Sequence, residues 1–297
     1  MLRQLKKEWP LHVLLIPGLI ITAIFSYGPI YGLIMAFQDF SPAHGFWGSP
    51  WVGLDNFRWI FSEAQFQRAL FNTFFISLMK IFFGVVTPVV FALLLNEIRL
   101  SSVKRVFQTI IYIPNFISWV ILAGIFMTIL GSRGIVNTTI GLFGLGPVDF
   151  LTDPGNFPWT MIWTDVWRRF GFGTVVYLAT IVSIDPGLYE SAVMDGAGRW
   201  KQTIKVTLPL MTPIIILMSV LALGNVLDAG FDQIFNLYSP SVFETGDIIQ
   251  TYVFRVGLHG ANFEIGAAVG FFNSVVSLIL MLIALSVAYK VANYKVF

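Results

Sequence analysis

Six long apolar runs constrain the fold of this chain more than any other feature of its sequence. Each run has about 20 residues or more, which is the length that an α-helix needs to cross a hydrocarbon core of about 30 Å. The runs lack the alternation of apolar and polar residues that is typical of membrane barrel strands, so helices remain to satisfy the backbone in lipid. We therefore predict an all-α, polytopic membrane protein with six transmembrane helices, formed by residues 12–37, 69–95, 106–130, 159–184, 212–234 and 265–289.

The composition supports this fold class and excludes several functions. Of the 297 residues, 56% are hydrophobic and only 11% are charged, whereas charged residues make up about 25% of a soluble domain. The net charge of +2 is too small for a charge-driven nucleic-acid binder, so no nucleic-acid partner is expected. The chain has no Cys, and His12, His44 and His259 lack the spacing of metal ligands, so no metal site is predicted.

The distribution of Lys and Arg predicts the orientation of the chain, because basic residues concentrate on the cytoplasmic side of a membrane. The segments at both termini, between the second and third runs and between the fourth and fifth runs hold Arg3, Lys6, Lys7, Arg99, Lys104, Arg105, Arg199, Lys201, Lys205, Lys290 and Lys295. The segments on the opposite side hold only Arg58, Arg68, Arg133 and Arg255. Both termini are therefore predicted to be cytoplasmic.

The connection between the fourth and fifth runs has a helical pattern of its own. Pro186 and Gly187 end the preceding helix, and Asp195–Gly196 predicts a turn between two short helices, the second of which ends at Pro209. Apolar residues at helical spacing are Leu188, Ala192 and Val193 on the first helix and Trp200, Ile204 and Leu208 on the second. This hairpin is too short to span a membrane. Its periodicity fits either the membrane surface or a groove of another protein, and by itself favours the surface.

The same connection resembles the EAA loop of binding-protein-dependent ABC importer permeases. The pattern reads Glu190-Ser-Ala-x-x-Asp195-Gly196-Ala197, and then has Val206, Leu208-Pro209 and Pro213. It departs from the family at Ser191, where Ala is usual, and at Val206, where Ile is usual. In that family the loop forms coupling helices that fit into a cleft of the cytoplasmic ATPase. The resemblance implies an ATPase-coupling site made of Glu190, Ala192, Asp195, Gly196, Ala197, Leu208 and Pro209.

A wider stretch of the chain, residues 69–289, resembles the permease core of carbohydrate importers similar to the maltose permease pair. The segments Gly53–Phe57 and Phe231–Pro240 resemble the first subunit of that pair, in a branch associated with oligosaccharides and polysaccharide fragments. The resemblance implies a type I ABC importer permease fold in the bacterial cytoplasmic (inner) membrane. It also implies a heterodimer with a second permease chain, two ATPase subunits, and an extracytoplasmic solute-binding protein that delivers the carbohydrate.

This resemblance divides the chain into four parts. They are a cytoplasmic N-terminal segment (1–10), the first transmembrane helix with an outer loop (11–68), the permease core (69–290) with its EAA loop at 185–213, and a cytoplasmic tail (291–297). The first run follows basic residues, as a signal peptide does. However, it is too long and lacks an A-x-A cleavage site, so it is predicted to be a retained helix.

The chain carries no sequence pattern for using ATP or for catalysis. The phosphate-binding pattern G-x-x-x-x-G-K-[ST] is missing, and no motif places a nucleophile beside a base. We therefore expect a transport subunit rather than an enzyme, without a cofactor in this chain, and with ATP and Mg bound by the partner ATPase. An ion-coupled secondary transporter is the alternative, although such proteins are expected to show two related halves, which this sequence does not.

Polar residues at lipid depth mark the predicted substrate path, because each costs several kcal/mol unless it is paired or faces water. Asp165 precedes Arg168 and Arg169 at a spacing that permits pairing along one helix face. The resemblance implies that Asn225 and Asp228 contact sugar from the fifth helix. The predicted path consists of Lys80, Asp165, Arg168, Arg169, Asn225, Asp228 and Asp232, with Trp163, Trp167, Phe172 and Phe231 as faces on which sugar rings stack.

Two interpretations of these charges stay open at the level of sequence. In the first, Asp165, Arg168, Arg169 and Asp228 only tie the fourth and fifth helices together. In the second, the cations Lys80, Arg168 and Arg169 attract an acidic sugar such as a uronate oligomer, and the arginines form paired hydrogen bonds to its carboxylates.

Overall fold

The computed structural model describes the backbone of residues 2–292 and the side chains of residues 9, 11 and 13–286. Within this range the regular structure is helical, joined by turns and irregular segments, and one isolated bridge pairs Gln38 with Trp51, which confirms the predicted all-α class. Five helical stretches are long and apolar enough to cross a membrane, or up to six if one bent pair counts as a single span. Most of the predicted tail, from residue 293 on, and most side chains of the predicted segment 1–10 lie outside the described residues.

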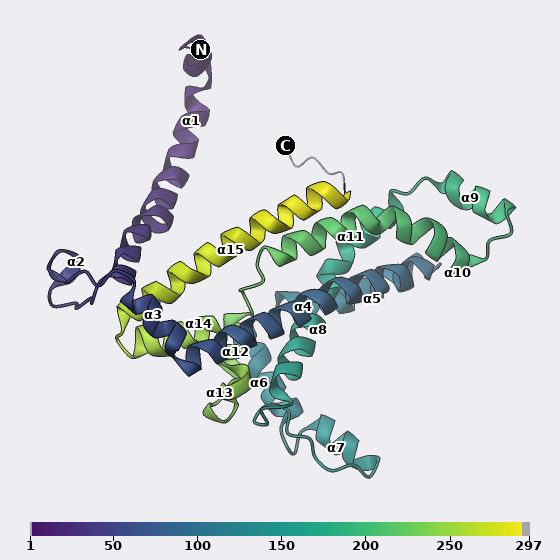
Figure 1. Cartoon of the computed structure of the whole chain (residues 1–297). Coiled ribbons are helices and arrows are strands. Elements are labelled where there is room, and N and C mark those ends of the chain that lie inside the picture. The colour runs from purple at the N-terminus through teal and green to yellow at the C-terminus, as the bar shows by residue number, and fades with distance from the viewer. Residues whose placement is uncertain (1, 293–297) are drawn as a thin grey trace. The chain divides into compact units, whose positions relative to one another are not determined.

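The helices form two compact units. The first unit combines residues 1–63 with residues 253–274. Its elements are α1 (Leu2–Thr22), η1 (Ala23–Tyr27), η2 (Gly28–Phe37), α2 (Gly45–Gly48), α3 (Asp55–Ser62), η6 (Val253–His259) and the beginning of α15 (Phe263–Ala292) (Figure 1). The rings of Phe37, Phe57 and Phe271 hold η2, α3 and α15 together, with centroid distances of 5.3, 5.4 and 5.9 Å.

The second unit comprises residues 64–252 and the chain from residue 275 on. Before the connection to α9 it contains α4 (Ala64–Glu97), α5 (Ser101–Tyr112), η3 (Ile113–Phe116), α6 (Trp119–Leu130), α7 (Ile135–Leu142) and α8 (Phe157–Val182). After α8 it contains α9 (Pro186–Met194), α10 (Arg199–Gln202), η4 (Thr203–Thr207), α11 (Leu208–Leu223), α12 (Phe231–Leu237), η5 (Pro240–Val242), α13 (Phe243–Gly246) and α14 (Ile249–Tyr252). Within this unit, α9 and α10 lie at the opposite end from α12 and α13 (Figure 1).

The long helices α4 and α8 form the centre of the second unit, with a buried apolar cluster toward each end. One cluster joins α4 and α8 to α6 and α12, with Ile76, Ala123 and Ile234 among its buried members. The other joins α4 and α8 to α11, through residues such as Ala92, Tyr177 and Met211. The two clusters leave the middle of α8 free for polar residues, and Asp165, Arg168 and Arg169 lie there.

Two of the six predicted spans are interrupted, which corrects the prediction. Run 106–130 is divided into α5, η3 and α6, because Pro114 lacks an N–H and the chain is extended at Ser118. The Ser118 hydroxyl then accepts a hydrogen bond from the Ile121 N–H at 3.4 Å and caps α6. Run 212–234 is interrupted at residues 224–230, between α11 and α12, and Gly230 has a φ of +90°. Asn225 and Asp228 therefore lie in a helix break and not on a fifth helix as predicted.

The prediction that Pro209 ends the second short helix of the hairpin is also wrong. The segments α10, η4 and α11 follow one another without a gap, so the helical stretch runs on from Arg199 to Leu223. Pro209 lies in the first turn of α11, where a missing N–H is tolerated, and the preceding turn Thr203–Thr207 is a π-helix. The connection therefore passes directly into a membrane-spanning helix.

Candidate functional site

A pocket of about 440 Å³ lies where the two helix breaks meet the middle of α8. Ser118 and Trp119 line it after the first break, and Arg168 and Arg169 line it from α8. Asp228 and residues 230–232 line it from the second break. Irregular backbone at membrane depth is tolerated where it lines a cavity or is buried in protein, so both breaks have a structural reason to meet here.

Arg168 binds the backbone of the first break. Its Nε donates to the Ile117 carbonyl at 3.1 Å and its Nη2 to the Asn115 carbonyl at 3.3 Å. Its guanidinium also lies over the Trp119 ring, 5.0 Å from the ring centroid. Arg168 thereby satisfies carbonyls that lost their helical partners at the break, and these two bonds use two of its five N–H donors.

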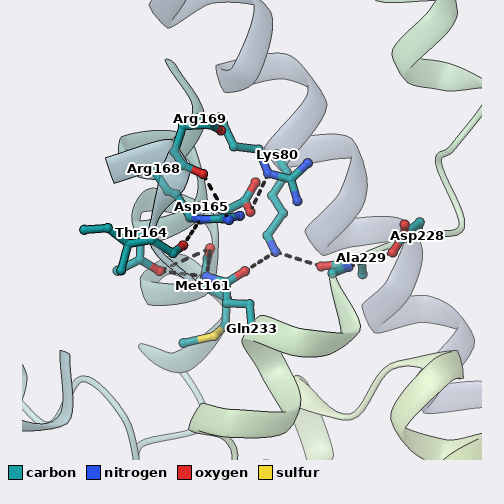
Figure 2. A network of polar contacts seen from close by, with 12 residues as sticks. Lys80, Met161, Thr164, Asp165, Arg168, Arg169, Asp228, Ala229 and Gln233 are labelled. Atoms are coloured by element: carbon teal, nitrogen blue, oxygen red, sulfur yellow. Dashed lines mark hydrogen bonds and ion pairs between the residues drawn. The ribbon is translucent and has the colours of Figure 1, made fainter. Parts of the chain in front are cut away.

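Lys80 binds the backbone of the second break from the buried face of α4. Its Nζ donates to the Ala229 carbonyl at 2.7 Å and also to Gln233 Oε1 (Figure 2). Gln233 in turn donates from Nε2 to the Met161 carbonyl and to Thr164 Oγ1, both at 2.8 Å. This buried network joins α4, α8 and the start of α12.

Arg169 differs from the other two cations because its side chain is 58% exposed. Its Nε lies 3.0 Å from Oδ1 of Asp165, whose side chain is only 8% exposed. Among the described residues, Asp165 is the partner of Arg169, and the contact is made through Nε. The terminal nitrogens of the guanidinium have no described partner. A buried carboxylate thus orients a guanidinium that is open to the pocket.

The formal charges on the pocket wall balance. Arg168 and Arg169 face Asp228 and Asp232, and both aspartates are exposed. The pocket therefore does not attract anions through net charge. It offers guanidinium donors beside carboxylate acceptors, which is a pattern that suits a ligand carrying both carboxylates and hydroxyls.

Four other predicted path residues, Trp163, Trp167, Phe172 and Asn225, lie outside the lining of this pocket. The Trp163 ring packs against Phe83, with centroids 4.5 Å apart, and the Trp167 ring packs against Phe126 at 5.6 Å. Phe172 and Asn225 are exposed elsewhere in this region. Phe231 lines the pocket and stacks on Phe235, with centroids 5.1 Å apart and planes inclined by 19°.

Four residues of the pocket and its network were not predicted from the sequence: Ser118, Trp119, Gly230 and Gln233. Pro114 and Gly230 were visible signals of helix breaks, but nothing in the sequence indicated that the two breaks share one pocket. Gln233 lies near the end of the fifth predicted run, and its buried amide connects Lys80 to α8.

The predicted coupling residues form a hairpin at the end of the second unit opposite α12. Asp185 caps α9 by accepting from the Gly187 N–H at 2.9 Å. After α9, the Ala197 N–H donates to the Ala192 carbonyl at 2.8 Å and the Gly196 N–H to the Val193 carbonyl at 2.9 Å. These two bonds form a Schellman motif, which requires the positive φ of +72° at Gly196.

The hairpin has an exposed surface, and polar contacts hold it to α4 and to the start of α11. Glu190, Asp195, Gly196 and Pro209 are exposed, whereas Ala192, Ala197 and Leu208 are half-buried. Met194 and Trp200 expose 87% and 77% of their surfaces, so the hairpin offers apolar surface for contact with lipid or protein. Arg199 pairs with Glu97 of α4 at 2.8 Å, and the Tyr189 and Thr207 hydroxyls lie 2.9 Å apart.

The pocket between two helix breaks, together with the hairpin that runs into α11, defines a membrane permease. The chain matches the family of the binding-protein-dependent transport system inner membrane component over residues 84–294, and it belongs to that family. It is 39% identical to the polygalacturonan/rhamnogalacturonan transport system permease protein YteP of Bacillus subtilis (strain 168), over 98% of this chain and 91% of that protein.

Two solved structures have the same fold. A chain of a bacterial ABC transporter involved in the import of the acidic polysaccharide alginate has a TM-score of 0.89 and 41% identity, over 97% of this chain and 98% of that chain. A chain of a bacterial alginate ABC transporter in complex with an alginate pentasaccharide-bound periplasmic protein has a TM-score of 0.91 and 40% identity, over 100% of this chain and 99% of that chain.

These likenesses establish a type I ABC importer permease, a multi-pass protein of the inner membrane. The chain is a transport subunit and not an enzyme. The alternative of an ion-coupled secondary transporter is excluded by membership of this family.

Proposed function

We propose that this chain forms half of the translocation path of an ABC importer for an acidic oligosaccharide or polysaccharide fragment. Arg169 carries this proposal, because its Nε lies 3.0 Å from the buried Asp165 carboxylate while its exposed side chain lines a pocket of about 440 Å³. A guanidinium fixed in this way suits a bidentate contact with a uronate carboxylate. Asp228 and Asp232, on the same pocket wall, accept hydrogen bonds from sugar hydroxyls, and the Phe231 ring offers a stacking face.

The proposed importer contains further subunits. A second, similar permease chain completes the path, and two ATPase subunits dock below and bind ATP and Mg, so this chain holds no cofactor. A solute-binding protein delivers the sugar from the extracytoplasmic side. Both termini of this chain are then cytoplasmic, on the same side as the hairpin that carries Glu190, Asp195 and Gly196. The relatives that transport polygalacturonan, rhamnogalacturonan or alginate support an acidic substrate.

Arg169→Gln is expected to remove the preference for acidic sugar. The amide keeps a donor near the pocket but loses the charge and the paired N–H groups that match a carboxylate. A charge-assisted bidentate contact contributes about 1.5–3 kcal/mol, so affinity for a uronate oligosaccharide should fall on the order of tenfold to a hundredfold. The measurement is ATP-driven uptake of that oligosaccharide into proteoliposomes by the complex with its cognate binding protein.

The control for this variant is Arg133→Gln, which removes an exposed guanidinium from the turn between α6 and α7. Uptake by the control should match the wild type. A carboxyl-reduced form of the same oligosaccharide provides the matched neutral ligand for binding to the permease complex alone. If the wild-type complex binds the acidic and reduced forms equally well, the assignment of an acidic substrate is wrong.

Glu97→Gln is expected to reduce coupling modestly. It removes the charge from the Glu97–Arg199 pair that braces the hairpin against α4. Both side chains are about half exposed, and an ion pair of this kind contributes roughly 0–1 kcal/mol, so sugar imported per ATP hydrolysed should fall by at most about fivefold. Asp55→Asn, which breaks a pair with Arg58 in the other unit, is the control. An equal loss in both variants contradicts a specific brace.

A further inference from the structure

Lys80 is the most deeply buried of the cations predicted to attract the substrate, with 9% of its surface exposed. It is not among the residues that line the pocket. Its described hydrogen bonds go to the Ala229 carbonyl and to Gln233 Oε1, and so remain within the chain. A buried ammonium that is satisfied in this way has no reason to leave its partners for a sugar.

Each of the two residues that accept a hydrogen bond from Lys80 is adjacent in sequence to an aspartate of the pocket. Ala229 directly follows Asp228, and Gln233 directly follows Asp232. The amine therefore holds the residue next to each of the two aspartates that line the pocket. Figure 2 shows Lys80 reaching from α4 to both of these residues.

The backbone between the two aspartates turns beside Lys80. Ala229 is buried in the apolar cluster around α12, and the Ile234 N–H donates to the Gly230 carbonyl at 3.2 Å. Gly230 has a φ of +90°, and its N–H donates to Asp228 Oδ1 at 3.1 Å. A Cβ placed on Gly230 would lie 3.2 Å from the Lys80 Nζ, so the turn lies directly against the amine. Gln233 extends the support to α8, through the Met161 carbonyl and the Thr164 hydroxyl.

We propose that Lys80 is a positioning residue that sets the placement of Asp228 and Asp232 in the substrate pocket and does not contact the sugar. This inference rests on the proposed function and narrows it, because it removes one of the three candidate cations from substrate recognition. Arg168 binds two carbonyls of the first break, whereas the described partner of Arg169 is Asp165, so Arg169 is the cation that this proposal assigns to the carboxylate of the ligand.

The test compares the effect of Lys80→Met on two ligands. Dissociation constants are measured for a uronate oligosaccharide and for its carboxyl-reduced form, on the purified permease–ATPase complex without the binding protein. Loss of the amine leaves the Ala229 carbonyl and Gln233 Oε1 without their donor, so both dissociation constants should rise on the order of tenfold. Their ratio should stay at the wild-type value, whereas Arg169→Gln should move the ratio toward one.

Two results overturn the proposal. If Lys80→Met shifts the ratio toward one as Arg169→Gln does, the amine reads the carboxylate of the ligand. If it leaves both dissociation constants unchanged, the amine does not position the aspartates. Lys104→Met, on α5, is the control for removal of a lysine outside the network, and it should leave both constants at their wild-type values.

A milder variant keeps the test decisive if Lys80→Met fails to assemble. Thr164→Val retains the branched shape but removes the hydroxyl that accepts from Gln233, so both constants should rise about twofold to threefold. Unchanged constants in this variant overturn the proposal. If the wild-type complex has equal dissociation constants for the two ligands, the proposal of an acidic substrate is wrong. A rise in both dissociation constants in Lys80→Met still tests the positioning role of Lys80.

Discussion

Gly171→Ala is expected to prevent stable assembly of the helices around the pocket. Gly171 is buried on α8, and a Cβ there would lie 1.9 Å from the Ile111 carbonyl oxygen and 2.5 Å from its carbonyl carbon. Both atoms belong to the backbone of α5, so no side-chain rotation relieves the clash. The two helices must separate, and the loss of packing should exceed the roughly 1–3 kcal/mol that ordinary overpacking costs.

The measurement is the thermal stability of the purified chain, followed as the fraction that stays monodisperse in size-exclusion chromatography after heating. Gly171→Ala should show a large fall in the midpoint temperature or yield no folded protein. Gly84→Ala on α4 and Gly124→Ala on α6 are matched controls, because a Cβ at either position meets nothing within 4 Å. If Gly171→Ala is as stable as these controls, α5 and α8 do not pack closely at Gly171 and the prediction is wrong.

Gly171→Ala is also expected to alter the pocket. Helix α5 ends at Tyr112, and the first break begins with Ile113, so a displaced α5 carries the Asn115 and Ile117 carbonyls away from Arg168. Backbone carbonyls that lose their donor at membrane depth cost several kcal/mol. The close contact at Gly171 and the bonds of Arg168 therefore stabilise the same geometry.

The fold was largely predictable because apolar length alone identifies segments that cross lipid. The breaks were not, since hydropathy reports the tendency of a segment to enter lipid and not the continuity of its backbone. Residues 212–234 remain apolar enough to pass as one helix, although Gly224 and Gly230 interrupt it. In the same way, the run around Pro114 and Ser118 is apolar on both sides of its break.

The candidate pocket was predictable in part. Arg168, Arg169, Asp228 and Asp232, which were selected because charge is costly in lipid, line one pocket in the structure. The sequence alone did not separate the cations that bind the chain itself from the one that is open to the pocket. That distinction depends on which carbonyls lose their helical partners, and therefore on where the breaks lie in three dimensions.

Gly196→Val is expected to abolish ATP-driven uptake while the chain still inserts in the membrane. Gly196 closes the Schellman motif between α9 and α10 at a φ of +72°, and a Cβ there would meet nothing within 4 Å. The penalty therefore comes from the backbone, at about 1–2 kcal/mol for an ordinary L-residue and more for a β-branched one. A hairpin that loses this turn no longer presents Glu190 in a fixed place, so force from the proposed ATPase is not passed into α11.

A series of variants at this turn separates backbone conformation from side-chain contact. Asn tolerates a positive φ better than other residues, so uptake should decrease in the order Gly196→Asn, Gly196→Ala, Gly196→Val. Gly198→Ala, two residues on, is the matched control, because its φ of −67° suits any residue and its Cβ also meets nothing within 4 Å. Uptake per ATP hydrolysed is the quantity to compare. If Gly196→Val retains wild-type uptake, a rigid turn is not required for coupling, and the hairpin would have to act through its exposed side chains, Met194 and Trp200 above all.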